Sequence, residues 1–319
     1  MSSREERNIH ERTRRLQQKT FRQVATPGVE ISDGEYISQG ILELGTLTWD
    51  FQGNTTTTEC TQPALCKDGT LLYEVVRVDS THMAWRKGTT SGTTVTWASW
   101  HSIDVLFWGT SGPGCTIFNG DLYIAVCQAP YASIHVVPVD LATEQVGSWM
   151  WIPGASYQTP DLEVFPNSST LQLIVIGTDY GIYRKSYTIA GGWTIWVADT
   201  AGAIEGRIQS AVYNNGLYII GQGIPGTWAP CYIGYWNSSL VWQGWTGISQ
   251  PSGERLDILT ISTSALGIEL FAITETLKIY HRRYTGSWGT YLYLATPLIF
   301  TFLGSETIGD YSYLHYRHN

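Results

Sequence analysis

The chain has 319 residues and a net charge of −8, with 43% hydrophobic and 14% charged residues. That length suffices to bury one large core or two ordinary ones. Gly (33), Tyr (19) and Trp (14) are abundant, which disfavours long surface helices and favours short strands joined by turns. No run of about 18 apolar residues occurs, so the sequence predicts no membrane span.

Residues 1–35 differ in character from the rest of the chain. Ser3 and Glu6 have the spacing of a capping box, which predicts a partly helical arm. Residues 1–22 carry three acidic and seven basic side chains, the basic ones being Arg4, Arg7, Arg12, Arg14, Arg15, Lys19 and Arg22. The net charge of this segment is therefore +4, and the remainder carries −12. We interpret the arm as an anchor for a protein partner or a neighbouring subunit, and the acidic remainder argues against nucleic-acid binding by the main domain.

The N-terminal sequence and the number of cysteines indicate in which cellular compartment the protein is made. MSSREERNIHERTRRLQ has no apolar centre, so we expect no secretory signal and synthesis in the cytoplasm. Incorporation into a virus or phage particle is our hypothesis for the protein's destination. The five cysteines, Cys60, Cys66, Cys115, Cys127 and Cys231, are expected to be free thiols, and pairing of the first two stays open. No sequence motif predicts a metal site or a cofactor.

One apolar, leucine-centred strand recurs along the chain. NGDLYIAV at residues 119–126 and NGLYIIG at residues 215–221 are two of its copies. The six copies are centred on Leu72, Leu122, Leu171, Leu217, Leu270 and Leu314. Their spacing of 44 to 53 residues is typical of the blades of a β-propeller.

A second element, an aromatic strand running into a tryptophan, also occurs six times. The tryptophans are Trp49, Trp97, Trp149, Trp193, Trp242 and Trp288. The pattern often continues as W-x-x-W, for example from Trp97 to Trp100 and from Trp193 to Trp196. We expect the six pattern tryptophans to fill the core between blades, where large aromatic side chains bury the most surface.

The two elements are offset by half a unit, which predicts how the fold closes. The first tryptophan strand, ending at Trp49, has no leucine strand before it, and the last leucine strand, around Leu314, has no tryptophan strand after it. We therefore predict an all-β, six-bladed propeller over residues 36–319, closed by N- and C-terminal strands and preceded by a short arm. Closure removes free sheet edges. A tandem β-solenoid is the rival architecture.

The repeat units W-x-x-W, NG-x-LY and an aromatic strand with IY followed by W resemble those of propeller lectins. These include the six-bladed fucose-binding lectins of fungi and bacteria and the tectonin-like propellers, and the resemblance spans residues 36–319. It implies sugar recognition in clefts between blades, built in the fucose lectins on an Arg, a Glu and an aromatic residue in each blade. Here the strand position of Arg77 holds Cys127, Ile176 and Gly221 in other units, which argues against equivalent fucose sites.

Four aromatic residues outside the repeat pattern are candidate ligand contacts. Tyr131, Tyr180 and Trp228 follow the leucine strand in their units, and Trp108 lies in FWGTSGPG. Aromatic faces stack on the apolar faces of sugar rings while nearby polar groups bind hydroxyls. Packing against a neighbouring blade is the alternative for each of them.

The sequence favours a non-enzymatic binding propeller that is directed at glycans and displayed on a larger assembly by its arm. A structural or adaptor component of a virus or phage particle, without a sugar ligand, is the first alternative. A glycoside hydrolase is the second, because carboxylates distant in sequence can still meet across the ring. The scattered carboxylates include Glu74, Asp79, Asp161, Glu163, Glu205, Glu254 and Asp257. No catalytic motif such as G-x-S-x-G or H-E-x-x-H occurs.

Overall fold

The computed structural model describes most of the chain from residue 36 onward. The described ranges are 36–43, 48–55, 61–78, 81–92, 94–105, 111–128, 133–156, 158–165, 169–200, 204, 206–223, 231–251, 254–276, 278–295, 300–309 and 311–318. The strands in these ranges belong to one compact unit, Glu35–Asn319. The predicted arm at residues 1–35, with its seven basic side chains, lies outside the described residues.

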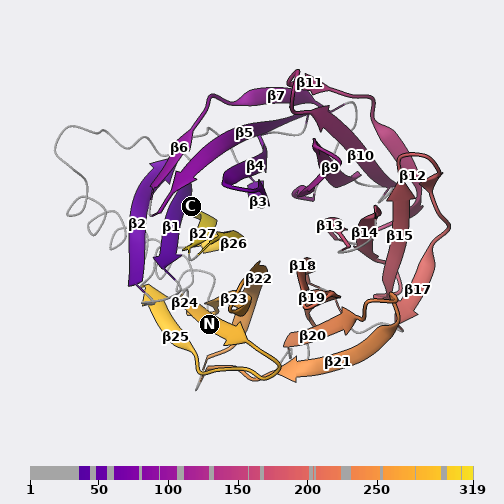
Figure 1. The fold of residues 1–319 in the computed structure, drawn as a ribbon. Helices are drawn as coiled ribbons and strands as arrows, with labels where there is room; N and C mark the ends of the chain where they lie inside the picture. The colour runs from indigo at the N-terminus through magenta and orange to yellow at the C-terminus, as the bar shows by residue number, and fades with distance from the viewer. Residues whose placement is uncertain are drawn as a thin grey trace, which may run out of the picture. The chain divides into compact units, whose positions relative to one another are not determined.

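The described strands form six antiparallel sheets arranged around a ring, here called blades 1 to 6 (Figure 1). Blade 1 contains β3 (Thr61–Asp68), β4 (Leu71–Arg77), β5 (His82–Ser91), β6 (Thr94–Trp97) and β7 (His101–Asp104). Blade 2 contains β8 (Gly114–Phe118), β9 (Asp121–Gln128), β10 (Ser133–Asp140), β11 (Gln145–Val146) and β12 (Met150–Ala155). Blade 3 contains β13 (Asp161–Val164), β14 (Leu171–Ile176), β15 (Ile182–Thr188), β16 (Gly192–Trp193) and β17 (Val197–Thr200).

The remaining blades have four strands each. Blade 4 contains β18 (Gln209–Tyr213), β19 (Gly216–Gln222), β20 (Cys231–Trp236) and β21 (Trp242–Ile248). Blade 5 contains β22 (Leu256–Ser264), β23 (Gly267–Thr274), β24 (Ile279–Tyr284) and β25 (Leu292–Ala295). Blade 6 contains β26 (Phe300–Ile308), β27 (Tyr311–His318), β1 (Tyr36–Glu43) and β2 (Thr48–Thr55).

Blade 6 joins the two ends of the described chain, which confirms the predicted closure. β1 pairs antiparallel with β27 from Tyr36 opposite His318 to Glu43 opposite Tyr311. The innermost strands of successive blades contact one another in the order β26, β3, β8, β13, β18, β22 and back to β26. In Figure 1 these strands surround the centre of the ring. Each leucine strand is second from the centre.

The recurring Asn-Gly dipeptide is explained by the turn between the first and second strands of a blade. Asn119 and Gly120 have φ values of 55° and 86°, and Asn214 and Asn215 have 47° and 59°. Two successive residues with positive φ make a hairpin turn whose twist matches the flanking strands, and Asn and Gly tolerate that conformation best. NGLYIIG therefore encodes a turn residue followed by the second strand of blade 4.

The core lies between the faces of neighbouring blades. The second-strand leucines Leu72, Leu122, Leu171, Leu217 and Leu270 are fully buried there. The pattern tryptophans Trp97, Trp149, Trp193, Trp242 and Trp288 pack against these clusters but are only half-buried, and the side chain of Trp49 is outside the described residues. The most deeply buried tryptophans, Trp85 and Trp236, come instead from the third strands.

Four cysteines are described, and all are buried and free. They are Cys66, Cys115, Cys127 and Cys231, which confirms the prediction of free thiols for these four, while Cys60 lies outside the described residues.

Within the described part of the chain, no helix has the length and hydropathy to cross a membrane.

Candidate functional site

Only one of the four predicted ligand aromatics is described. Tyr180 lies in the turn between β14 and β15, has a φ of 64° and donates its backbone N–H to the Gly177 carbonyl at 3.0 Å. It is half-buried and lies at the end of the strands opposite the first hairpin turns. Trp108, Tyr131 and Trp228 lie outside the described residues, and their role stays a prediction.

A recurring position on the third strand of the blades forms a more specific constellation. In blades 1 to 4 it is the residue paired with the second-strand position two places after the recurring leucine, and in blades 5 and 6 it is the residue paired with that leucine itself. Its side chain faces the preceding blade. Around the ring from blade 6 to blade 5 it is Gly40, Arg86, Val137, Lys185, Gly234 and Arg282. A cation therefore occupies this position in every second interface between blades.

The W-x-x-W spacing brings aromatic rings onto this position. In blade 1 the outer strand is interrupted between β6 and β7, and Trp97 and Trp100 flank the interruption. Both rings stack on the Arg86 guanidinium, each with its centroid 4.2 Å from Cζ. In blade 5 the Arg282 guanidinium lies 5.4 Å from the Trp288 ring and 4.6 Å from the Tyr291 ring. Such contacts stabilise a partly desolvated cation.

The cations of blades 1 and 5 have acceptors within the protein. Arg86 Nε donates to Glu74 Oε2 at 2.7 Å, and Glu74 is paired with Arg86 across β4 and β5. Arg282 donates to the carbonyls of Gly289 and Ser249 and, at 2.8 Å, to the Ser249 hydroxyl. Glu74 is completely buried and Arg86 only 7% exposed, so this ion pair satisfies both charges inside the protein.

Lys185 of blade 3 differs from both. Its ammonium lies 5.3 Å from the Trp196 ring, and the residue is 8% exposed. Within the described part of the chain it has no hydrogen-bond acceptor or ion-pair partner, because the residue opposite it on β14 is Leu173 rather than a carboxylate. Burial lowers the pKa of Lys185 below its ordinary value. A desolvated cation without an acceptor is costly to the folded chain, and it can be stabilised by an acceptor on a ligand.

The surroundings of Lys185 are aromatic. The interface between blades 2 and 3 contains the half-buried rings of Tyr183, Tyr187, Trp193 and Trp196. Trp196 is fixed in place because its indole N–H donates to the Pro153 carbonyl of β12. Tyr183 points to the same side of β15 as Lys185, since side chains two residues apart on a strand share a face. This arrangement offers stacking surfaces beside one positive charge.

The other interfaces fill the same position without charge. At Gly234 in blade 4, an added Cβ would meet the rings of Trp242 and Trp245, the latter at 2.9 Å. The two rings therefore take the space that the cation takes in blades 1, 3 and 5. Val137 in blade 2 is fully buried in the core between blades 1 and 2. Among the described cations at the equivalent positions, Lys185 is thus the one without a protein acceptor.

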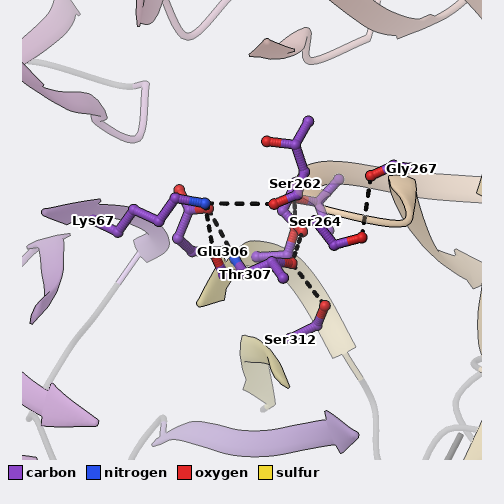
Figure 2. A network of polar contacts seen from close by, with 10 residues as sticks. Lys67, Ser262, Ser264, Gly267, Glu306, Thr307 and Ser312 are labelled. Atoms are coloured by element: carbon purple, nitrogen blue, oxygen red, sulfur yellow. Dashed lines mark hydrogen bonds and ion pairs between the residues drawn. The ribbon is translucent and has the colours of Figure 1, made fainter. Parts of the chain in front are cut away.

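A separate cavity of about 670 Å³ lies at the mouth of the central channel, on the side of the first hairpin turns. It is lined by turn residues of blades 1, 4, 5 and 6, among them Lys67, Asn214, Ser264 and Thr307. Figure 2 shows Lys67 reaching across to Glu306 and the strand end at Thr307. A chain of hydroxyls, from Ser262 to Thr307 at 2.6 Å and on to Ser312 at 2.7 Å, lies beside it.

Carboxyl groups of the innermost strands interact near this channel. Burial, and then the charge of Glu306, raises the pKa of Glu163 to about 8. Burial raises the pKa of Asp161 to about 6, although its carboxylate accepts from the Ser210 hydroxyl at 2.6 Å. A protonated carboxyl can serve as a general acid, but neither Asp161 nor Glu163 lines the cavity. Among the described residues, no group of three His, Cys, Asp or Glu side chains is placed to hold a metal ion.

The sequence did not lead us to predict Arg86, Lys185 and Arg282 as site residues, although it contains a signal for them. Each third strand of blades 1, 3 and 5 contains a basic dipeptide, in AWRKG, IYRKS and YHRRY. Because adjacent side chains on a strand point to opposite faces, one cation of each dipeptide faces the preceding blade and the other faces the next blade. A search for period alone does not detect this pattern, since it occurs in every second unit.

Comparison with known proteins gives the fold a clear context. No protein-family model and no curated protein sequence matches the chain. Among solved structures, the fungal Aleuria aurantia lectin, described as a six-bladed β-propeller with a novel fucose recognition mode, matches with a TM-score of 0.57 and 13% identity over 78% of this chain and 85% of its own. The chain is a six-bladed β-propeller.

Two further solved structures match this propeller in fold at low sequence identity. AofleA from Arthrobotrys oligospora matches with a TM-score of 0.55 and 11% identity, over 89% of this chain and 81% of its own. A protein of unknown function from Dyadobacter fermentans matches with a TM-score of 0.59 and 9% identity, over 90% of this chain and all of its own. At these identities the likeness concerns the fold, and the function has to be argued from the site.

Proposed function

We propose that this propeller is a non-enzymatic sugar-binding protein and that a sugar binds between blades 2 and 3, beside Lys185 and Trp196. The observation that carries the proposal is Lys185, a residue that is only 8% exposed and whose ammonium has no acceptor in the described chain. The equivalent cations, Arg86 and Arg282, have acceptors of their own. The Aleuria aurantia lectin, which has the same fold, recognises fucose, and that likeness supports the proposal without deciding the ligand.

The chemistry of the interface suits a sugar. Carbohydrate rings have apolar faces that stack on aromatic side chains and hydroxyls that need directional polar partners. Trp196 and Tyr183 supply the first, and Lys185, with three donor hydrogens, supplies the second. Long lysine side chains commonly bury the stem and hold the ammonium toward water, which gives a ligand hydroxyl access to the donors.

A glycan array with the full chain, followed by titration of the strongest glycan, tests the proposal. We expect Lys185→Met and Trp196→Ala each to weaken binding by about tenfold or more, as loss of one charge-assisted hydrogen bond or one stacking surface implies. Lys87→Gln is the matched control, because Lys87 is an exposed cation of another blade. Absence of binding to any glycan, or equal binding by both variants and the control, refutes the proposal.

The same array titration includes the aromatic residues predicted from the sequence. Tyr131→Ala, Tyr180→Ala, Trp228→Ala and Trp108→Ala are measured beside the Lys185 variant. A loss confined to these variants would move the sugar site from the interface to the loops. A loss confined to Lys185→Met and Trp196→Ala supports the interface.

Display on a larger assembly is the second part of the proposed function. The support is the charge contrast between the arm, at +4 over residues 1–22, and the remainder, at −12. Opposite charges of this size attract at physiological salt over about 8 Å. Deleting residues 1–30 should leave a folded propeller that binds the same glycans but no longer joins its partner or neighbouring subunit. Unchanged assembly of the deletion variant would refute this role for the arm.

A further inference from the structure

The position of Lys185 can be compared directly with that of Arg86. Both residues lie on the third strand of their blade, face the preceding blade and contact a W-x-x-W tryptophan. Opposite Arg86 the second strand carries Glu74, whereas opposite Lys185 it carries Leu173. In blade 1 the chain itself supplies a carboxylate as the partner of this cation, whereas in blade 5 Arg282 takes two carbonyls and a hydroxyl.

We propose that the site between blades 2 and 3 binds a sugar that bears a carboxylate. The negative charge of that carboxylate binds the Lys185 ammonium, as Glu74 binds Arg86 in blade 1. This inference rests on the proposed sugar site and names the class of its ligand. A charge-assisted hydrogen bond to a partly desolvated ammonium is stronger than one to a neutral hydroxyl. An uncharged sugar would leave the positive charge of Lys185 unbalanced.

The nearest acidic side chains along the sequence cannot serve as an internal counter-ion. Asp199 accepts from Arg184 Nε at 3.2 Å, and Arg184 points to the opposite face of β15, because adjacent residues on a strand alternate. Asp179 accepts from the Tyr183 hydroxyl at 2.7 Å and from the Gly181 N–H at 3.1 Å. Both carboxylates are thus committed to other donors, and neither is a counter-ion of Lys185 among the residues that the structure describes.

The aromatic neighbours favour a carboxylated sugar over a simple anion. Trp196 and Tyr183 are half-buried, so part of each side chain stays accessible, and the Trp196 ring lies 5.3 Å from the ammonium. A ligand with both a carboxylate and an apolar ring face can satisfy the cation and cover these rings at once. Uronic and sialic acids have this combination, whereas inorganic anions and acetate lack the ring.

The test compares two acidic sugars with their uncharged counterparts by isothermal titration of the full chain. The probes are methyl glucuronide and the methyl glycoside of N-acetylneuraminic acid, each beside its carboxyl methyl ester, and sodium acetate. We expect at least one acid to bind about tenfold or more tightly than its ester. Rising salt should narrow that difference, because it screens the ion pair.

Variants assign the effect to the residue. Lys185→Met keeps the unbranched stem but removes the ammonium, and it should abolish the preference for the acid, whereas Lys185→Arg should keep that preference. Lys87→Gln should change nothing. Circular dichroism of each variant verifies the fold, and if Lys185→Met does not fold, Lys185→Gln replaces it.

The failures of the two proposals are distinguishable. If esters bind as tightly as acids and binding depends on Trp196, the sugar site stands and the acidic ligand is refuted. If acetate binds as tightly as the acids, the site recognises a carboxylate alone and the acidic-sugar proposal is refuted. If neither acid binds here and the array shows no bound glycan, both proposals are refuted. Preference for the acid that survives in Lys185→Met overturns the assignment to this residue.

Discussion

Lys67 Nζ lies 2.9 Å from Glu306 Oε1, joining the innermost strand of blade 1 to that of blade 6 (Figure 2). The same ammonium donates to the carbonyls of Thr307 at 2.5 Å and of Thr263 at 3.4 Å. One side chain therefore connects blades 1, 5 and 6 at the point where the two ends of the described chain close the ring. The hydroxyl pair Thr260–Ser305, at 2.9 Å, adds a second link between blades 5 and 6.

Removal of this cation should weaken closure of the ring. Lys67→Met leaves the half-buried Glu306 carboxylate and two carbonyls without their donor, so we expect a loss of about 1–3 kcal/mol in the free energy of unfolding. Urea unfolding at pH 7 measures it. Lys67→Met combined with Glu306→Gln should recover part of the loss, because the unpaired charge is then removed. If the free energy of unfolding of Lys67→Met lies within about 0.5 kcal/mol of the wild-type value, the Lys67–Glu306 contact does not contribute to stability.

Glu163 predicts how stability depends on pH. Its pKa rises from the ordinary 4.5 to about 8 in the folded chain, chiefly through burial, so the folded state keeps a proton that the unfolded state releases. Stability should therefore fall as pH rises from 4.5 to 8, by at most about 1.4 kcal/mol per pH unit. Glu163→Gln should flatten this slope in urea unfolding between pH 5 and 8.5. The same substitution at the exposed Glu275 is the control, and an unchanged slope in Glu163→Gln would contradict the pKa shift.

The buried pair of blade 1 should behave as a unit. Arg86→Met leaves the fully buried Glu74 carboxylate without its cation, and such losses cost about 3–5 kcal/mol. Adding Glu74→Leu should recover more than half of that loss, since blade 3 already carries Leu173 at the equivalent place. Differential scanning calorimetry of the two variants decides between a coupled pair and independent residues. Additive losses would contradict the coupling.

Two glycines of blade 4 give a matched test of packing. An added Cβ at Gly234 meets Trp242 and Trp245, whereas at Gly247 it meets no heavy atom within 4 Å. Gly234→Ala should destabilise the propeller by about 1–3 kcal/mol, because a packed core resists added volume. Gly247→Ala should stay within about 0.5 kcal/mol of the wild type. Equal melting temperatures for the two variants would mean that the rings of Trp242 and Trp245 move freely aside.

The repeat made the fold predictable from the sequence. The spacing from Leu72 to Leu314 indicated six units, and the half-unit offset at Trp49 indicated a blade shared by both ends, which the pairing of β1 with β27 confirms. These features are visible because period and turn chemistry are local properties of a sequence. The depth of the tryptophans was less predictable: Trp97 and Trp193 are half-buried, whereas Trp85 and Trp236, which have no place in the period, are fully buried.

The candidate site was not predictable in the same way. In sequence, Lys185 is part of a basic dipeptide on a third strand, just as Arg86 and Arg282 are. Only the pairing of β15 with β14 shows that Leu173 lies opposite Lys185, whereas Glu74 lies opposite Arg86 in blade 1. Likewise, the sequence does not show that Asp199 is committed to Arg184. Whether a cation has a partner depends on which strands lie opposite each other, and that is a property of the folded chain.

The most direct test of sugar binding between blades 2 and 3 is a crystal structure of the full chain with the strongest glycan from the array. We predict the sugar within hydrogen-bonding distance of Lys185 Nζ and against the Trp196 ring. A sugar bound only at the channel mouth beside Lys67, or only at the loops near Tyr180, would contradict the site proposed here.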